Sequence, residues 1–202
     1  LYGGIILTIS LAILFFGFSQ IRLNGRKEIK RIILFIFGMF GSFIVVNAYW
    51  FLPVLSGFFA SYSQGLSAIG GLSGVLAWST EISKNASYLN LFRLQGIPDW
   101  YGNILHSYSN HFLTNPILIL FSFLIPIIVF SSLFIVKKSP QYLKYVIYCN
   151  ILALVAIIFT AGSHPPLGFI FDFFLAFVPG FAIFRTPIYK FAPALWFAYS
   201  YL

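Results

Sequence analysis

The basic residues of this chain are sorted into short stretches between long apolar runs. Eight of its twelve Lys and Arg residues lie in residues 22–31 and 137–144. The first stretch carries five bases against one acid, Glu28, and the second carries three bases and no acid. A water-soluble core does not require this sorting, whereas a bilayer does, because basic loops are retained on its cytoplasmic side. The pattern therefore predicts an integral membrane protein with both basic stretches in the cytoplasm.

The composition points the same way. Hydrophobic residues make up 60% of the chain and charged residues 8%, whereas an ordinary soluble domain is about 45–50% apolar and about 25% charged. The net charge of +8 would suit a nucleic-acid partner. The bases lie directly beside apolar runs, however, which favours anionic lipid headgroups. We therefore expect membrane lipids, and no nucleic acid, among the partners.

Several apolar runs are long enough to cross a bilayer, for which about 20 residues span about 30 Å of hydrocarbon. Pro126 is expected to kink the third of these spans. The chain begins at Leu1 and ends inside an apolar run, which favours an internal piece of a longer protein with a truncated last span. The expected fold class is all-α, a polytopic transmembrane helical bundle forming one domain over residues 1–202. The expected spans are about 4–21, 32–55, 116–136, 145–161 and 187–202.

The segment between the second and third spans, residues 56–115, is too long for a simple connection. It carries two bases and two acids, and the alternation of loops places it on the outer face. Its glycine-rich first part, 56–79, predicts a re-entrant or surface-lying segment, because bare backbone cannot face lipid. Residues 83–94 predict a short amphipathic helix in the headgroup layer, with Ser83 as its N-cap.

Signatures of common enzyme sites are absent from the sequence. It has no P-loop, dinucleotide-binding glycine fingerprint, paired cysteines or His-Glu metal helix. His106 and His111 are five residues apart and do not share one helical face. Cys149, the single cysteine, is expected to be a small buried apolar side chain. No metal site and no cofactor are therefore identified, the catalytic residue is unknown, and a divalent metal remains open for the full-length protein.

The candidate site lies in residues 162–191. Residues 168–178 form an apolar segment too short to cross a bilayer, and it contains Asp172, an acid in a costly and often functional setting. Arg185 and Lys190 then follow on the outer side, where the positive-inside rule would not place them. Two such cations suit a phosphate anchored in the membrane, because Arg can grip a phosphate with two parallel hydrogen bonds. Alternatively, Arg185 pairs with Asp172 as a structural bridge and Lys190 snorkels to the interface. Both interpretations stay open on the residues alone.

Several short motifs resemble polytopic membrane glycosyltransferases of the GT-C type, with arabinofuranosyltransferase-like and YfhO-like membrane proteins as the nearest subgroups. Three of them lie near the C-terminal end: a Gly-x-x-x-Pro-Leu-Gly turn at 162–168, a Pro-Gly-Phe at 179–181 before an Arg, and a Phe-Arg-x-Pro-x-x-Lys-Phe run at 184–191. The other two are an Asn-x-x-Trp-x-x-Pro feature at 47–53 and an Asn-Leu-x-Arg-Leu-x-Gly stretch at 90–96.

This resemblance implies an enzyme that transfers a sugar from a polyprenyl-phosphate donor to a glycan or protein acceptor on the outer face of a prokaryotic plasma membrane. By the same analogy, Arg185, Lys190 and His164 would hold the phosphate of the donor. Members of the class place a catalytic acid in an outer loop after their first span. We expect that loop upstream of Leu1, so Asp99 and Asp172 do not inherit the role and remain structural or site acids.

Two other functional classes stay open. A secondary transporter or lipid flippase is compatible with broken helices and a lone acid in an apolar segment. A non-catalytic membrane assembly protein is the third class.

Overall fold

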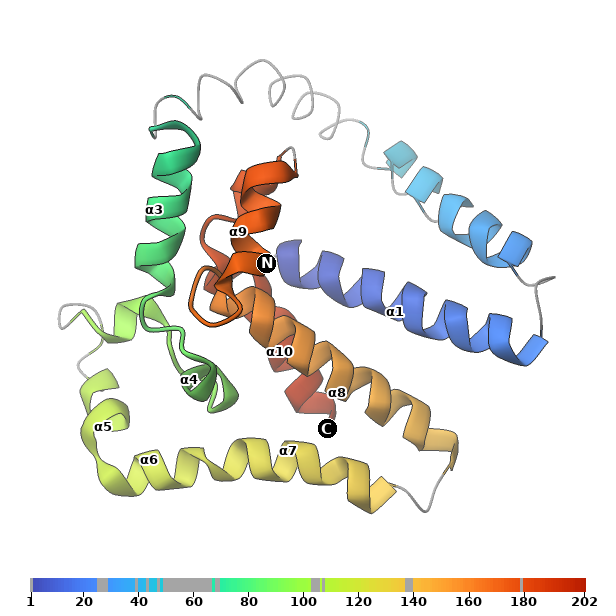
Figure 1. Ribbon diagram of the computed structural model, residues 1–202. Coiled ribbons are helices and arrows are strands. Elements are labelled where there is room, and N and C mark those ends of the chain that lie inside the picture. Colours follow the sequence, from blue (N-terminus) through green and yellow to red (C-terminus); the bar gives the residue numbers. More distant parts are fainter. Residues whose placement is uncertain are drawn as a thin grey trace. The chain divides into compact units, whose positions relative to one another are not determined.

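The computed structural model of the chain is built from helices (Figure 1). By its contacts the chain divides into two compact units, one of residues 9–71 and one of residues 1–8 with 72–202. No strand occurs in the described residues, which confirms the predicted all-α class. The residues that the structure describes are 2–24, 29–38, 40–42, 44–46, 48, 67, 70–102, 106, 108–136, 140–178 and 180–202.

Among the described residues, four helical stretches are long and apolar enough to cross a membrane, by length and composition. They correspond to the first four predicted spans, although the second helix begins at Ile29 rather than at the predicted 32. Its predicted end at 55 lies outside the described residues. The four apolar stretches are Gly3–Arg22 in α1 (Tyr2–Asn24), Ile29–Val46, Pro116–Ile135 and Tyr142–Ala161 in α8 (Pro140–Ala161).

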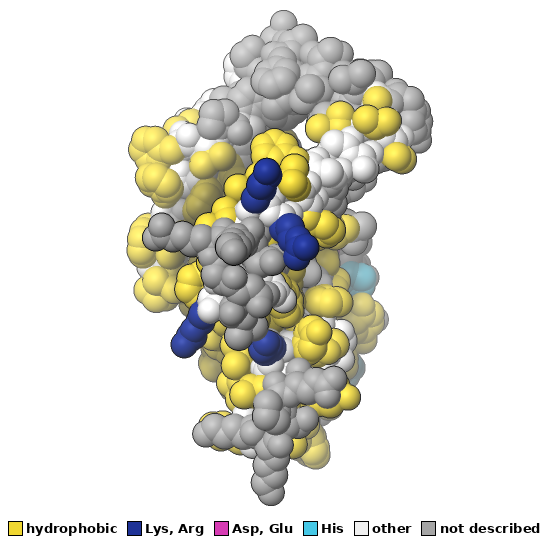
Figure 2. Space-filling model, turned by 90° about the vertical axis from the view of Figure 1, so that its right-hand side faces the viewer, with side chains coloured by type: hydrophobic (Ala, Val, Ile, Leu, Met, Phe, Trp, Pro, Cys, Tyr) yellow, Lys and Arg dark blue, Asp and Glu magenta, His cyan; other side chains and the backbone are white. Residues whose placement is uncertain are grey.

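Large apolar side chains are exposed along these helices. Leu14 of α1 is 67% exposed and Phe134 of the third stretch is 76% exposed. On the face shown in Figure 2, hydrophobic side chains cover most of the described surface, and the few charged side chains are Lys or Arg. Apolar surface of this extent is typical of a protein that faces lipid.

The third stretch is interrupted in its middle. It consists of α6 (Pro116–Ser122) and α7 (Leu124–Ile135), with a turn at Phe123 between them. Pro126 lacks a backbone N–H, and its ring crowds the carbonyl of Ser122, four residues earlier. The N–H of Phe123 donates to Leu120 O at 3.1 Å, which is the shorter, three-residue hydrogen bond. This interruption lies three residues before Pro126, in the part of the stretch where a kink is predicted.

The core of the larger unit is the contact between α8 and α10 (Pro187–Tyr201), which lie side by side (Figure 1). Buried residues recur on both helices at intervals of three and four, so each helix turns one face toward the other. Alanines in these faces let the two backbones approach closely, as is usual for apolar helices in membranes. The buried residues are Cys149, Leu152, Ala153, Ala156, Ile157 and Thr160 on α8, and Ile188, Phe191, Ala192, Leu195 and Ala198 on α10.

A cluster of phenylalanines joins α8 and α10 to the segment between them. That segment contains α9 (Gly168–Phe177), which at 10 residues is too short to cross a bilayer, as predicted, and η3 (Phe181–Phe184). Ring centroids lie 5.6 Å apart for Phe159–Phe174, 5.4 Å for Phe171–Phe181 and 5.4 Å for Phe184–Phe191. The cluster thereby positions the backbone that carries Arg185.

The predicted outer loop contains α3 (Gly71–Ser83), α4 (Tyr88–Phe92), η1 (Pro98–Trp100) and α5 (Ser109–Thr114). The prediction of one helix over 83–94 capped by Ser83 is wrong. The cap of α4 is Ser87, whose hydroxyl accepts a 3.3 Å hydrogen bond from the N–H of Asn90. Ser83 instead ends α3, and its hydroxyl is engaged by a residue 80 positions further along the chain.

Candidate functional site

The turn between α8 and α9 is held by a chain of hydroxyl groups that ends on Asp172. The hydroxyl of Ser163 donates to Asp172 Oδ1 at 2.6 Å. Ser79 Oγ lies 2.7 Å from Ser163 Oγ. Because the one proton of the Ser163 hydroxyl is given to Asp172, Ser79 must be the donor in this second bond. The N–H of Ser163 also donates to Ser83 Oγ at 3.3 Å, so α3 is hydrogen-bonded to this turn at two points.

Gly162 allows the close approach that makes this turn possible. Its φ of +57° lies in the left-handed region that favours glycine. A Cβ at this position would overlap the ring of Pro187 and the hydroxyl of Ser83. The turn is therefore pressed against the first residue of α10, two residues after Arg185.

His164 is oriented by the end of α3. Its Nδ1 lies 3.1 Å from the carbonyl oxygen of Ser83. A carbonyl can only accept, so Nδ1 carries a proton and Nε2 is the ring nitrogen left for another partner. The ring is half-buried, and no described residue forms a hydrogen bond with Nε2. His164 can therefore offer a second polar contact to a ligand at this surface.

Arg185 and Lys190 flank the start of α10. Arg185 follows η3, and Thr186, the N-cap residue of α10, makes no side-chain cap hydrogen bond. Among the described residues, no carboxylate lies within ion-pair distance of either cation. The alternative of an Arg185–Asp172 bridge is therefore not found among the described residues, and Asp172 accepts a hydrogen bond from Ser163.

Lys190 also lies against the beginning of α1. A Cβ at Gly3 would be 3.0 Å from Lys190 O and 3.2 Å from Lys190 Cβ, and one at Gly4 would be 2.9 Å from Ala194 N. The two glycines thus let the first turn of α1 touch α10. Lys190 lies in the first turn of α10, whereas Arg185 precedes this helix and is separated from it by the non-helical Thr186.

Asp99 of η1 lies beside α10. The hydroxyl of Tyr189 lies within hydrogen-bonding reach of the Asp99 side chain. Tyr189 lies in the first turn of α10, four residues after Arg185. The structure therefore gathers four predicted site residues around the start of α10 and the turn before α9: His164, Asp172, Arg185 and Asp99. Each of the two acids is engaged by a hydroxyl group rather than by a cation.

Arg93 is a buried residue that connects several elements through its side chain, and the sequence interpretation did not predict this role. It is only 9% exposed. Its Nη2 donates to Asn90 Oδ1 at 2.7 Å and its Nη1 to Ser122 Oγ at 3.3 Å. Its Cζ lies 4.9 Å from the ring centroid of Phe123, a cation–π contact. Arg93 therefore links α4 to Ser122 and Phe123, the residues at which the helix is interrupted between α6 and α7.

Asn90 extends the same network. Its Nδ2 donates to Asn85 O at 2.9 Å and to the hydroxyl of Tyr101 at 3.0 Å. Burial raises the pKa of Tyr101, while the charge of Arg93 acts in the opposite direction. The available sequence signal was the three-residue spacing of Asn90 and Arg93, which makes them neighbours on one helical face.

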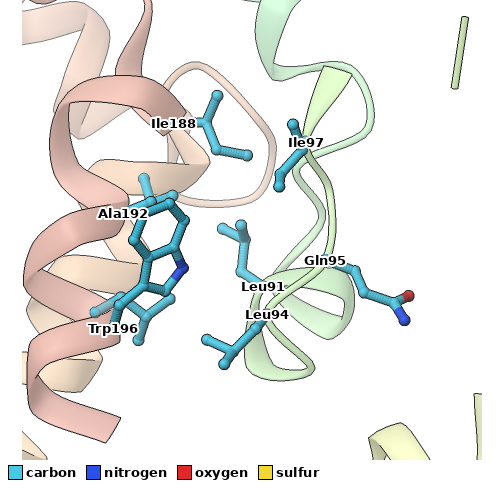
Figure 3. Close-up of a pocket in the computed structure, with 9 residues that line it drawn as sticks. Leu91, Leu94, Gln95, Ile97, Ile188, Ala192 and Trp196 are labelled. Atoms are coloured by element: carbon cyan, nitrogen blue, oxygen red, sulfur yellow. The ribbon is translucent and has the colours of Figure 1, made fainter. Parts of the chain in front are cut away.

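A small cavity lies between α10 and residues 91–97 (Figure 3). Leu91, Leu94 and Ile97 point toward Ile188 and Trp196 across it, whereas the amide of Gln95 points away. Its volume of about 10 Å³ holds at most one water molecule. This cavity is a small gap in the packing between α10 and residues 91–97, and it is too small for a sugar or a lipid.

Metal-binding groups are dispersed in the described residues. No three of their His, Cys, Asp and Glu side chains gather closely enough to hold a metal ion. The ring of His106 instead packs on Tyr108 at 5.2 Å between centroids. The motif at 47–53, apart from Ala48, lies outside the described residues.

Comparisons with protein-family models, curated proteins and solved structures found no match for this chain. The resemblance to GT-C-type glycosyltransferases therefore depends on the short sequence motifs alone.

Proposed function

We propose that this chain forms part of a membrane glycosyltransferase that takes a sugar from a polyprenyl-phosphate donor. In this proposal Arg185, Lys190 and His164 surround the donor phosphate. The observation that supports the proposal is that Arg185 has no carboxylate partner among the described residues, whereas Asp172 accepts from Ser163 and Tyr189 lies beside Asp99. A half-buried guanidinium beside apolar helices then lacks a counter-charge, which an anionic ligand would supply.

The start of α10 adds to the attraction for an anion. The first turn of a helix carries a partial positive charge and unpaired N–H groups. Thr186 leaves these groups without a side-chain cap, and Arg185 directly precedes it. A guanidinium can form two parallel hydrogen bonds to a phosphate. The Nδ1–H of His164 is already bonded to Ser83 O, so its Nε2 would face the ligand, as a donor when the ring is protonated.

The reaction that fits this site is displacement at the anomeric carbon of the donor sugar. The bond from that carbon to the phosphate oxygen breaks, and the oxygen of an acceptor hydroxyl bonds to the same carbon. The acceptor proton passes to a base, and polyprenyl phosphate departs with the bonding electron pair. Fixed cations stabilise the charge that develops on the departing phosphate. Neither Asp99 nor Asp172 is assigned as the base.

The proposed orientation follows from the charges of the loops. The stretches 22–31 and 137–144 lie in the cytoplasm because they are strongly basic. Arg185 and Lys190 then face the outside, next to the outer leaflet of a prokaryotic plasma membrane. The acceptor would be a glycan or protein of the cell envelope.

The test is turnover by the protein that carries this chain, reconstituted in lipid nanodiscs with a panel of polyprenyl-phosphate pentoses and hexoses. Arg185→Ala should lower sugar transfer about 100-fold, the typical cost of losing one transition-state donor. Lys84→Ala is the matched control, since Lys84 is another cation of the predicted outer face and is 69% exposed beside Glu81. Unchanged turnover in Arg185→Ala would overturn the proposal. Movement of the intact donor between leaflets, without cleavage, would support a flippase instead.

A further inference from the structure

The unit of residues 9–71 contains a groove of its own. The groove lies between α1 and the helix Ile29–Val46, and its volume is about 400 Å³. This volume lies within the range of about 300–1,000 Å³ that is typical of small-molecule sites. Its walls are apolar, with Phe16 and Gly17 on α1 and Ile32 and Phe35 on the second helix. All of its residues belong to this unit, whereas Arg185 and Lys190 belong to the other.

Gly17 lies in the wall of the groove, close to Ile32 of the second helix. A Cβ at this position would lie 3.6 Å from Ile32 Cγ2 and 3.9 Å from Ile32 Cδ1, which is ordinary van der Waals contact. An alanine would therefore fit, whereas a larger side chain would extend into the groove. The absence of a side chain at Gly17 therefore leaves this part of the wall without a group that could reach into the groove.

The polar lining of the groove is confined to the end near the connection between the two helices. Gln20 comes from the last part of α1 and Arg31 from the beginning of the second helix. The connecting stretch 22–31 carries five bases and one acid. An apolar body with one strongly positive end matches an acyl chain attached to an anionic headgroup, because basic pockets between membrane helices attract such headgroups.

We propose that this groove binds an anionic glycerophospholipid of the leaflet next to the 22–31 connection. One acyl chain lies along Phe16, Gly17 and Phe35, and the headgroup phosphate lies at Arg31. This site is independent of the proposed sugar transfer, because it shares no residue with the Arg185 site.

The test places a fluorescent reporter in the groove. Phe35→Trp protein is reconstituted in phosphatidylcholine nanodiscs that contain a small fraction of brominated phosphatidylglycerol or, separately, brominated phosphatidylcholine. Wild-type protein, with its four tryptophans, gives the background quenching. The anionic lipid should associate with the groove about fivefold more strongly than the zwitterionic lipid, as expected for one headgroup–base attraction. If Phe35→Trp does not fold, Ile36→Trp reports on the same groove.

Two matched pairs of variants identify the parts of the site. Arg31→Gln should abolish the preference for phosphatidylglycerol, whereas Lys144→Gln, at an exposed base of the other stretch, should keep it. Gly17→Leu should lower quenching by both lipids, whereas Gly17→Ala should not. Equal quenching by the two lipids would overturn the proposal. So would an equal effect of Lys144→Gln and Arg31→Gln, or a lack of quenching because another part of the protein fills the groove.

Discussion

Ser163 donates a 2.6 Å hydrogen bond to Asp172, nine residues further along the chain. This bond gives the acid of α9 a hydroxyl partner, and no carboxylate among the described residues lies within ion-pair distance of Arg185. Through Ser79, the same chain of hydroxyls reaches α3. Asp172 therefore acts as an acceptor that orders the turn before α9, and the cation beside α10 is available for an anionic ligand.

Replacement of Asp172 should distinguish a hydrogen-bond acceptor from an ion-pair partner. Asp172→Asn keeps an acceptor for Ser163 and should lower the free energy of unfolding by about 1 kcal/mol. Asp172→Leu removes the acceptor and should lower it by about 2–3 kcal/mol. The measurement is unfolding in mixed detergent micelles. Asp172→Asn and Arg185→Gln should be additive within about 0.5 kcal/mol. A larger coupling energy would indicate the ion pair instead.

Gly162→Ala should be strongly destabilising. The new methyl group would overlap Pro187 and Ser83, at a backbone φ of +57° that L-residues rarely adopt. Overpacking costs about 1–3 kcal/mol, and the left-handed conformation about 1–2 kcal/mol more. Gly102→Ala is the control, because a Cβ there has no neighbour within 4 Å. Equal thermal unfolding of the two variants would show that the turn does not depend on this close contact.

The long apolar helical stretches were predictable from the sequence because hydrophobic length and the position of Pro126 are local signals. The contacts that build the site are not local. Ser83 has the residue type of an N-cap, yet its hydroxyl accepts from the backbone of Ser163, 80 positions away. Ser87, four residues later, caps α4 instead. Similarly, the acceptors of Arg93 lie on two separate helices, and only one of them, Asn90, is near it in sequence.

Substitution of Arg93 should uncouple α4 from the broken third stretch. Arg93→Ala leaves Asn90 Oδ1 and Ser122 Oγ without their donor in a buried setting, so it should lower the free energy of unfolding by about 2–4 kcal/mol. Arg93→Lys keeps the charge but cannot reproduce the planar fork or the stacking on Phe123, and it should recover less than half of that loss. The exposed Lys84→Ala should change stability by less than about 0.5 kcal/mol. Full recovery by Arg93→Lys would show that charge alone matters.

Tyr101 should make stability depend on pH at the alkaline end. Burial raises its pKa above the ordinary value of 10.0, although the charge of Arg93 opposes the shift. The protonated hydroxyl is thus favoured in the folded state, so its contribution is complete below about pH 10 and is lost as pH rises through the folded pKa. Tyr101→Phe should reduce the slope of unfolding free energy against pH above 10, whereas Tyr108→Phe, at a 51% exposed ring, serves as the control. Identical slopes in wild type and Tyr101→Phe would contradict this assignment.

The sidedness of the chain can be measured with single cysteines. Cys149 is the only native cysteine and is 2% exposed, so Cys149→Ala provides a background without thiols. Lys84→Cys and Arg185→Cys should react with a membrane-impermeant maleimide in intact cells, because both positions lie on the predicted outer face. Lys30→Cys and Lys144→Cys, at exposed bases of the two basic stretches, should react only after permeabilisation. Reaction of Arg185→Cys together with Lys30→Cys would place the guanidinium on the cytoplasmic side. A donor presented at the outer face could not then be bound by Arg185, whereas the lipid groove at Arg31 would be unaffected.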